Sequence, residues 1–208
     1  MDRKTTEFYN RYADDGAIRA ESARSAVSAH FASAFKVGGK ILDVGAGSGR
    51  DVAVLRQLGF DAYGIEPNEA MRAFAVQTHP ELAGRLQSGS LPLCGRPFGG
   101  EFNGIVCSAI LMHIAEHNLL QSAASLRALL QPQGRLLISL PFMHPSILDG
   151  ERDQDGRFFI NHSPEAIQSL LEKHGFAQIG RWENNTVMQQ TQTLWFILLF
   201  ELSEHPPT

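Results

Sequence analysis

The chain has 208 residues, of which 43% are hydrophobic and 19% are charged, and its formal net charge is −4. This length is enough for one domain with a full hydrophobic core, and the composition is typical of a soluble globular protein. Because the chain is mildly acidic and has no run of lysines or arginines, it is poorly suited to neutralise many phosphates. The charge therefore argues against a nucleic-acid partner.

The sequence shows no signal for export or membrane insertion. Residues Met1–Lys4 lead into polar residues rather than an apolar run, and the longest apolar run, Leu194–Phe200, is too short to cross a bilayer. Two cysteines, Cys94 and Cys107, fit a reducing compartment and indicate neither a disulfide framework nor a zinc site. We therefore expect a cytoplasmic protein that does not contact a membrane.

The first 36 residues are predicted to be helical. Tyr9 and Tyr12 follow Phe8 at helical spacing, and an alanine-rich stretch runs from Ala17 to Phe35. We interpret residues 1–36 as a helical cap on a Rossmann-like core of residues 37–208, the two forming one domain. The spacing of the tyrosines suits closure over a ligand as well as it suits packing in the core.

Strands and helices alternate after the cap, which is typical of a parallel sheet covered on both faces. The expected strands are 40–44, 61–65, 85–88, 103–108, 134–140, 176–183 and 193–201, and the expected helices are 50–58, 68–77, 117–130 and 163–174. No helix separates the last two strands. We therefore expect an α/β fold with a mostly parallel, seven-stranded sheet that ends in an antiparallel hairpin. Leu194–Phe200, interpreted as an apolar edge strand, is able to pair with another chain, so both a monomer and a homodimer fit the sequence.

The most informative motif is the segment Ile41–Arg50. An apolar run is followed by Gly45, Gly47 and Gly49 and then by an amphipathic segment, which predicts a strand, a tight turn and a helix. A turn without side chains allows the backbone to lie against a ligand. Seventeen residues after this turn, the next strand ends in Glu66, where a carboxylate is well placed to accept hydrogen bonds from both hydroxyls of a ribose. Together these features predict a nucleoside cofactor.

The glycine spacing separates this motif from two other nucleotide-binding motifs. The dinucleotide fingerprint G-x-G-x-x-G needs a third glycine for close packing of helix and strand, and Arg50 occupies that position here. The phosphate loop G-x-x-x-x-G-K-[ST] is also absent from the sequence. A nicotinamide-dependent oxidoreductase is therefore a distant alternative.

The pattern Asp43-x-Gly45-x-Gly47-x-Gly49 resembles motif I of the class I S-adenosylmethionine-dependent methyltransferases. Further segments resemble the family's second strand and its acid (Glu66–Met71), its adenine loop (Ser88–Pro92), its fourth strand (Phe102–His113) and its fifth strand (Gln133–Leu140). The resemblance covers residues 37–202. Two positions depart from the family pattern: Gly89 stands in place of an acid, and Asn103 stands in place of an aspartate.

The resemblance implies S-adenosyl-L-methionine as the cofactor and assigns a set of contacts to it. Asp43 is expected to anchor the glycine turn, Glu66 to hold the ribose, Ser90 and Leu91 to contact the adenine, and Ser108 to lie beside the methionyl part. The full set of expected cofactor-binding residues is Tyr9, Asp43, Gly45, Ala46, Gly47, Gly49, Glu66, Pro67, Ser90, Leu91 and Ser108.

Methyl transfer from a sulfonium is an in-line displacement, so the protein has mainly to position the reactants and to exclude water. A base is needed only where the nucleophile must lose a proton. The candidate catalytic residues are His113, after the fourth strand, and His144, in the long loop 141–161. A merely structural role fits each of them as well. The pattern H-x-x-E-H at residues 113–117 resembles a zinc-protease motif but straddles a strand end, so no metal site is expected.

Three functions are compatible with these residues. We favour methyl transfer to a small-molecule acceptor, because the chain lacks an inserted lid or an extra domain. The alternatives are a methyltransferase acting on RNA or protein, and a binding protein that holds S-adenosylmethionine or S-adenosylhomocysteine without catalysis. The sequence does not specify which atom of the acceptor receives the methyl group.

Overall fold

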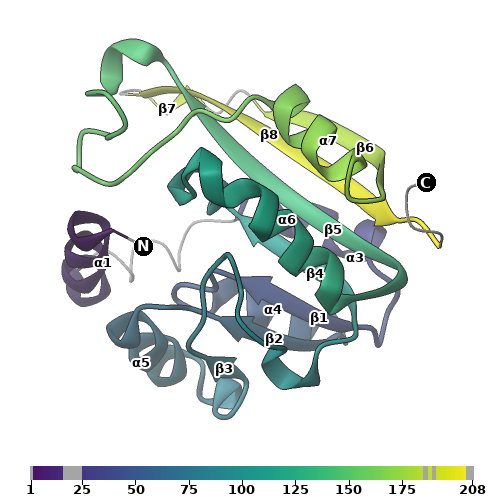
Figure 1. Cartoon of the computed structure of the whole chain (residues 1–208). Coiled ribbons are helices and arrows are strands. Elements are labelled where there is room, and N and C mark those ends of the chain that lie inside the picture. Colours follow the sequence, from purple (N-terminus) through teal and green to yellow (C-terminus); the bar gives the residue numbers. More distant parts are fainter. Residues whose placement is uncertain (1, 16–24, 185–186, 189–190, 205–208) are drawn as a thin grey trace.

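The computed structural model describes residues 2–15, 25–184, 187–188 and 191–204, and it shows one twisted sheet covered by helices (Figure 1). The strands are β1 (Lys40–Val44), β2 (Asp61–Ile65), β3 (Leu86–Gln87), β4 (Phe102–Ser108), β5 (Leu130–Met143), β6 (Phe176–Asn184), β7 (Val187–Met188) and β8 (Thr191–Leu202). The α-helices are α1 (Arg3–Asp15), α3 (Phe31–Ala34), α4 (Arg50–Gln57), α5 (Glu69–Thr78), α6 (Glu116–Leu129) and α7 (Pro164–Glu172). Short 3₁₀ helices lie between them: η1 (Ser28–His30), η2 (Pro80–Leu82), η3 (Pro97–Gly99), η4 (Leu111–His113) and η5 (Pro145–Ile147).

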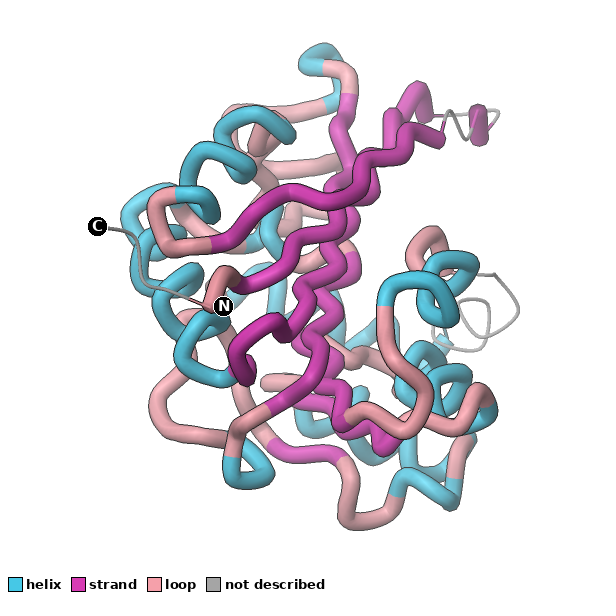
Figure 2. The backbone as a smooth tube through the Cα atoms, turned by 90° about the vertical axis from the view of Figure 1, so that its right-hand side faces the viewer, coloured by secondary structure: helices cyan, strands magenta, loops and turns pink. Residues whose placement is uncertain are grey.

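The strand order is β3-β2-β1-β4-β5-β8-β6, and the short β7 pairs with β8. The five strands from β3 to β5 are parallel, whereas β8 is antiparallel to both β5 and β6. Figure 2 shows helices on both sides of the strands. These observations confirm the predicted fold class, a mostly parallel Rossmann-like sheet with an antiparallel C-terminal hairpin.

One interpretation of the hairpin was wrong. Residues 194–200 belong to β8, which lies inside the sheet between β5 and β6, and the edge strand is β6. The pairing with β8 runs along β5 as far as Met143, so the strand expected at residues 134–140 extends three residues further and shortens the loop that follows. Because both edges of β8 are hydrogen-bonded, this strand is not available to pair with another chain.

The N-terminal cap differs from the continuous helix expected over residues 1–36. Helix α1 reaches Asp15, and residues 16–24 of the expected alanine-rich helix lie outside the described residues. From Ser25 onward the chain forms a turn, η1 and the four-residue helix α3, so the helix expected over residues 25–35 is present only in two short pieces. Phe31 and Phe35 are buried against the sheet, and this burial outweighs the helix propensity of the alanines around them.

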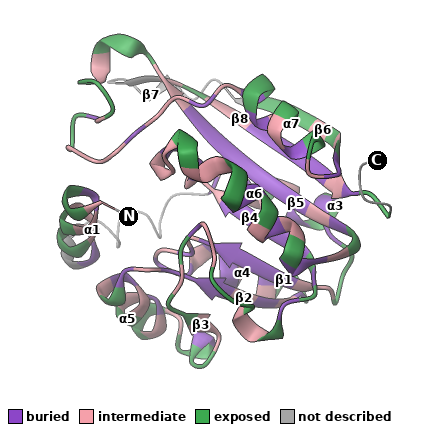
Figure 3. Cartoon of the chain, in the orientation of Figure 1, coloured by how far each residue is buried: buried purple, intermediate pink, exposed green. Residues whose placement is uncertain are grey.

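The sheet is buried on both faces (Figure 3). Alternate residues of β1 show the pattern: Leu42 joins the apolar cluster under α6 and α7, whereas Ile41 joins the cluster under α3 and α4. Ser163 caps α7 by accepting a hydrogen bond from the Ala166 amide at 3.1 Å, with Pro164 at the first helical position, as the sequence predicts. Among the described residues, the helices are too short or too polar to span a membrane.

We predict that Gly49→Ala destabilises the fold more than Gly38→Ala. Both glycines have a φ of 79°, which costs alanine about 1–2 kcal/mol. A Cβ at Gly49 would lie 2.7 Å from Leu82 Cδ1 and 3.1 Å from Ala75 Cβ, whereas a Cβ at Gly38 meets nothing within 4 Å. We therefore expect Gly49→Ala to lower the free energy of unfolding by about 1–3 kcal/mol more than Gly38→Ala does, measured in urea. Equal losses would show that the helix start is loosely packed.

Candidate active site

The carboxyl ends of the parallel strands meet at one edge of the sheet, where a cavity of about 1080 Å³ opens. Ligand pockets usually measure roughly 300–1,000 Å³, so this cavity lies at the upper end of that range. Of the residues expected to bind a cofactor, the cavity lining includes Tyr9, Asp43, Gly45, Ala46, Gly47, Glu66, Pro67, Ser90, Leu91 and Ser108. Gly49 is not part of the lining and serves as the N-cap of α4.

The glycine turn after β1 is held against the end of β2. The amides of Gly45 and Ala46 both donate to the carbonyl of Ile65, at 2.8 and 3.0 Å. A Cβ at Gly45, whose φ is 76°, would lie 2.3 Å from Ile110 Cγ2, so only glycine fits at this point. The turn therefore presents its backbone to the cavity.

Glu66 lies beside this turn with its carboxylate fixed by two backbone amides. One oxygen accepts from the Gly47 amide at 3.1 Å and the other accepts from the Asn68 amide at 2.8 Å. The residue is only 8% exposed, and this burial raises the pKa of its carboxyl group, while the two amides act in the opposite direction. Each carboxylate oxygen retains a lone pair for a further donor. This arrangement fits the two hydroxyls of a ribose.

Helix α1 lies across the open side of the cavity, between α5 and the loop that follows β5 (Figure 1). The Asn68 side chain caps α5 by accepting from the Met71 amide at 3.0 Å and donates to Asn10 Oδ1 at 2.7 Å, which ties α5 to α1. Tyr9 and Tyr12 pack on Met71 and also line the cavity. The two tyrosines therefore pack on α5 as one alternative expected, and they also border the cavity, which leaves closure over a ligand as a prediction.

Asp43 and Ser108 occupy the centre of the cavity wall, at the ends of β1 and β4. Burial raises the pKa of Asp43 well above its usual value, and the nearby carboxylate of Asp51 raises it further. Ser108 Oγ lies 3.4 Å from Ser139 Oγ, and the latter accepts from the Ala109 amide at 3.0 Å. This part of the wall thus carries small polar groups close to the glycine turn.

His113 carries a partly buried imidazole with a defined tautomer. Its Nδ1 lies 2.6 Å from the carbonyl of Phe158, which can only accept, so Nδ1 carries the proton in the neutral ring. Its Nε2 lies 3.1 Å from the hydroxyl of Tyr9 and therefore accepts that proton. Burial lowers the pKa of His113 and raises the pKa of Tyr9. The neutral pair lies in the cavity wall and is able to receive a proton.

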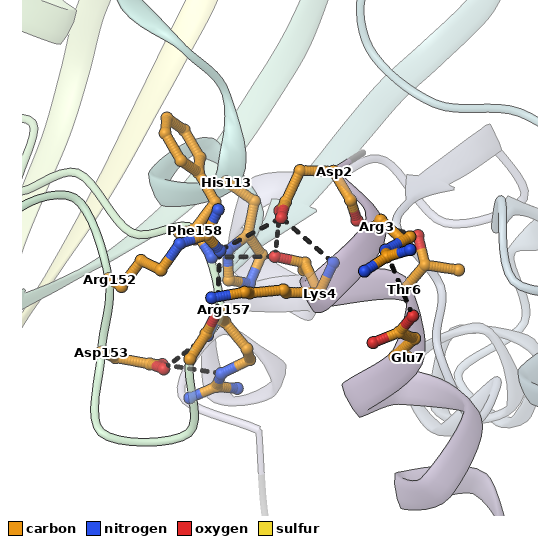
Figure 4. A network of polar contacts seen from close by, with 12 residues as sticks. Asp2, Arg3, Lys4, Thr6, Glu7, His113, Arg152, Asp153, Arg157 and Phe158 are labelled. Carbon is orange, nitrogen blue, oxygen red and sulfur yellow. Dashed lines mark hydrogen bonds and ion pairs between the residues drawn. The ribbon is translucent and has the colours of Figure 1, made fainter.

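The loop that follows β5 folds back on α1 through residues 152–158, as Figure 4 shows. Asp153, which is buried, accepts from Arg157 Nε at 2.7 Å and thereby closes a tight turn. Arg152 donates to the Asp2 carboxylate at 3.1 Å, and the Phe158 amide donates to Thr5 Oγ1 at 2.8 Å. The turn and the start of α1 therefore form one unit above His113.

Sequence reasoning missed Thr5, Asp153 and Phe158 as parts of this unit. The sequence signal was the density of charge in residues 149–157, which indicates a solvated surface more often than a site. The contacts join residues about 150 positions apart in the chain, and no local pattern indicates such a pairing.

A candidate catalytic residue, His144, and a position that departs from the family pattern, Asn103, both lie away from the cavity. His144 is exposed, is not part of the cavity lining, and bonds Ser146 Oγ at 2.7 Å, so the structure does not bring it to the candidate site. Asn103 lies at the opposite end of β4 from Ser108, where it accepts from the Lys40 amide at 2.8 Å. The departure from the family pattern at Asn103 therefore does not touch the cavity.

In the described part of the chain, no group of acidic, histidine or cysteine side chains is arranged to hold a metal ion.

The sheet order, the glycine turn and the buried acid after β2 define the class of the protein, which is a Rossmann-like, S-adenosylmethionine-dependent methyltransferase. Residues 16–179 match the family model described as a methyltransferase domain, and the chain belongs to this family. A comparison with curated protein sequences finds no match.

Solved structures of methyltransferases share the fold at low sequence identity. A TehB-like methyltransferase from Corynebacterium glutamicum is 20% identical, with a TM-score of 0.67 over 94% of this chain and 96% of that one. The 1,6-didemethyltoxoflavin-N1-methyltransferase of Burkholderia thailandensis, solved with its substrate and S-adenosylhomocysteine, is 21% identical (TM-score 0.64; 96% and 84% covered). The magnesium protoporphyrin IX methyltransferase of Synechocystis PCC 6803, solved with S-adenosylmethionine, is 18% identical (TM-score 0.70; 98% and 99% covered).

We predict that His113 makes the fold less stable in weak acid. The unfolded state takes up a proton on this histidine below about pH 6.5. The folded state resists that proton because burial lowers the pKa of His113, so the free energy of unfolding falls as the pH drops through this window. We expect His113→Gln to lose less stability than the wild type between pH 7.5 and 5.5, measured by urea unfolding. His117→Gln, in an exposed position, is the control. Equal losses in the wild type and His113→Gln would contradict a lowered pKa of His113 in the folded state.

Proposed function

We propose that this protein transfers the methyl group of S-adenosylmethionine to a small-molecule acceptor, and that one cavity holds both reactants. The observation that carries the proposal is the continuity of this cavity, which joins the glycine turn and Glu66 to the Tyr9–His113 pair. The acidic net charge argues against RNA as the acceptor.

The order of the strands supports a specific orientation of the cofactor. The ends of β3, β2, β1 and β4 follow one another across the sheet. Ser90 and Leu91 after β3 would hold the adenine, and Glu66 and Pro67 after β2 the ribose. Ser108 after β4 would lie beside the methionyl part. The cofactor would thus lie across the strand ends with its sulfur toward His113.

The bound cofactor supplies a methyl group attached to a positively charged sulfur. The chain's own residues would hold the acceptor in line with it and exclude water, and helix α1 and the turn 152–158 are placed to do so. Where the acceptor must lose a proton, the Tyr9 oxygen takes it and the Tyr9 proton moves to His113 Nε2. The carbonyl of Phe158 then stabilises the imidazolium through Nδ1. His144 has no part in this scheme.

Small acceptors are also the substrates of two proteins with this fold. The Burkholderia enzyme is named for 1,6-didemethyltoxoflavin and the Synechocystis enzyme for magnesium protoporphyrin IX. The two acceptors differ widely in size and chemistry, so they support a small-molecule acceptor in general and no particular one.

We predict that Glu66→Ala weakens cofactor binding by about 100-fold to 10,000-fold, because two hydroxyls lose a charged hydrogen-bond acceptor worth about 1.5–3 kcal/mol each. Calorimetric titration with S-adenosylmethionine and with S-adenosylhomocysteine measures this loss, and NADH serves as the negative ligand. The matched control is Glu69→Ala, which removes an exposed carboxylate three residues further along the chain. Unchanged affinity in Glu66→Ala would remove this residue from the site, and failure of both ligands to bind the wild type would contradict the proposed function.

We predict that the Tyr9–His113 pair is needed for turnover. The assay supplies methyl-labelled S-adenosylmethionine and separate pools of deproteinised metabolites, RNA and protein, and it follows the label. We expect label in the metabolite pool, reduced about 100-fold in Tyr9→Phe and in His113→Gln, with His144→Gln as the unaffected control. Label in RNA or protein instead would contradict the small-molecule acceptor, and full activity of both variants would remove the pair from the mechanism.

A further inference from the structure

Asn68 joins three parts of the molecule just beyond the end of β2. Its backbone amide donates to Glu66 Oε1 at 2.8 Å. Its side-chain oxygen accepts from the Met71 amide at 3.0 Å, which caps α5, and its side-chain nitrogen donates to Asn10 Oδ1 on α1 at 2.7 Å. Because the Met71 amide can only donate, it fixes which end of the Asn68 side chain faces α1. The buried Asn68 thus links the acid at the ribose site to the helix that covers the cavity.

Helix α1 is held in place by few buried side chains. Among the residues of α1 whose side chains are described, only Thr5 and Ala13 are buried. A helix of 13 residues is marginal on its own in water, so its position depends on contacts with the rest of the protein. Elements with little buried apolar surface also open more readily than the core. A single contact such as Asn10–Asn68 therefore weighs in the balance between docked and undocked α1.

The docked position of α1 is also what brings Tyr9 to His113. Tyr9 precedes Asn10 in the helix, and its hydroxyl lies 3.1 Å from His113 Nε2. Asn10 contacts the start of α5 and Tyr9 contacts η4, so α1 spans the two sides of the cavity. A change at the ribose site that alters the docking of α1 therefore reaches the imidazole.

A ribose at Glu66 would strengthen the series of contacts that leads to α1. Without a ligand, burial raises the pKa of the Glu66 carboxyl group, and a protonated carboxyl group is a weaker acceptor than a carboxylate. Two hydroxyls that donate to this group favour its charged form. The charged form binds the Asn68 amide more strongly and so fixes the residue whose side chain holds Asn10.

We propose that Asn68 and Asn10 are positioning residues that couple binding of the cofactor ribose to docking of α1. Docking of α1 in turn completes the Tyr9–His113 pair. This inference rests on the proposed function, because it takes the ribose at Glu66 and the base at His113 from it. Its physical content is that the Asn10–Asn68 hydrogen bond is stronger when the cofactor is bound. By reciprocity, removal of the Asn10 amide weakens cofactor binding by the same factor by which it reduces the effect of the cofactor on α1.

Hydrogen exchange of the α1 amides and calorimetric titration, both with S-adenosylhomocysteine, test the proposal. We expect saturating ligand to slow exchange in α1 of the wild type by about 5-fold to 150-fold. Helix α7, which has no residue in the cavity lining, is the unaffected reference. Asn10→Leu keeps a helix-forming residue and leaves the α5 cap intact, but it lacks the acceptor. In this variant we expect the slowing to be about 2-fold to 10-fold smaller and the dissociation constant to rise by the same factor.

Two further variants separate positioning from a general effect on the helix. Asn10→Asp keeps an acceptor oxygen at the same place, so it should keep both values within about twofold of the wild type. Arg11→Ala changes an exposed neighbour on α1 and should leave both values unchanged. Loss of coupling in Asn10→Leu together with rescue in Asn10→Asp is the result that supports the proposal.

The contrary outcomes distinguish this inference from the proposed function. If S-adenosylhomocysteine does not bind the wild type, the proposed function itself fails. If it binds and leaves exchange in α1 unchanged, the cofactor and α1 are not coupled. If Asn10→Leu speeds exchange equally with and without ligand, at an unchanged dissociation constant, the Asn10–Asn68 contact is merely structural, and the proposal is overturned.

Discussion

The site depends on the way the glycine turn after β1 is joined to the end of β2. The carbonyl of Ile65 accepts from the amides of Gly45 and Ala46, and the carboxylate of the next residue, Glu66, accepts from the amides of Gly47 and Asn68. Four hydrogen bonds thus fix two strand ends, one turn and the start of α5 relative to one another. Because these contacts leave the turn's backbone and part of the carboxylate facing the cavity, the hydrogen bonds that join the two strands at this edge also form one wall of the cavity.

The opposite wall of the cavity is built from segments far apart in the chain. Helix α1 contacts α5 through Asn10 and Asn68, and it contacts the turn 152–158 through Thr5 and Phe158. His113 connects the two sides, since its two ring nitrogens bond Tyr9 and the Phe158 carbonyl. Displacement of α1 would therefore remove the Tyr9 contact and expose the imidazole to water, so the pKa of His113 depends on the position of α1.

Local patterns in the sequence predicted the fold well, and most residues expected to bind a cofactor line the cavity. The strand–turn–helix around Gly45–Gly49, the acid at the end of β2 and the Ser163 cap of α7 each depend on residues that are neighbours in the chain. The position of β8 was wrong because an apolar run does not show whether a strand lies at an edge or inside a sheet. The partners of His113 were also beyond prediction, since its contacts with Tyr9 and Phe158 span 104 and 45 residues.

The central claim is that one nucleoside lies across the strand ends with its ribose on Glu66 and its sulfur toward the Tyr9–His113 pair. A crystal structure of the protein with S-adenosylhomocysteine tests this most directly. It should show both ribose hydroxyls within hydrogen-bonding distance of the Glu66 carboxylate, the adenine against Leu91, and the sulfur on the side of Ser108. A nucleoside bound in the reverse direction, or outside the cavity between the glycine turn and α1, would contradict the claim.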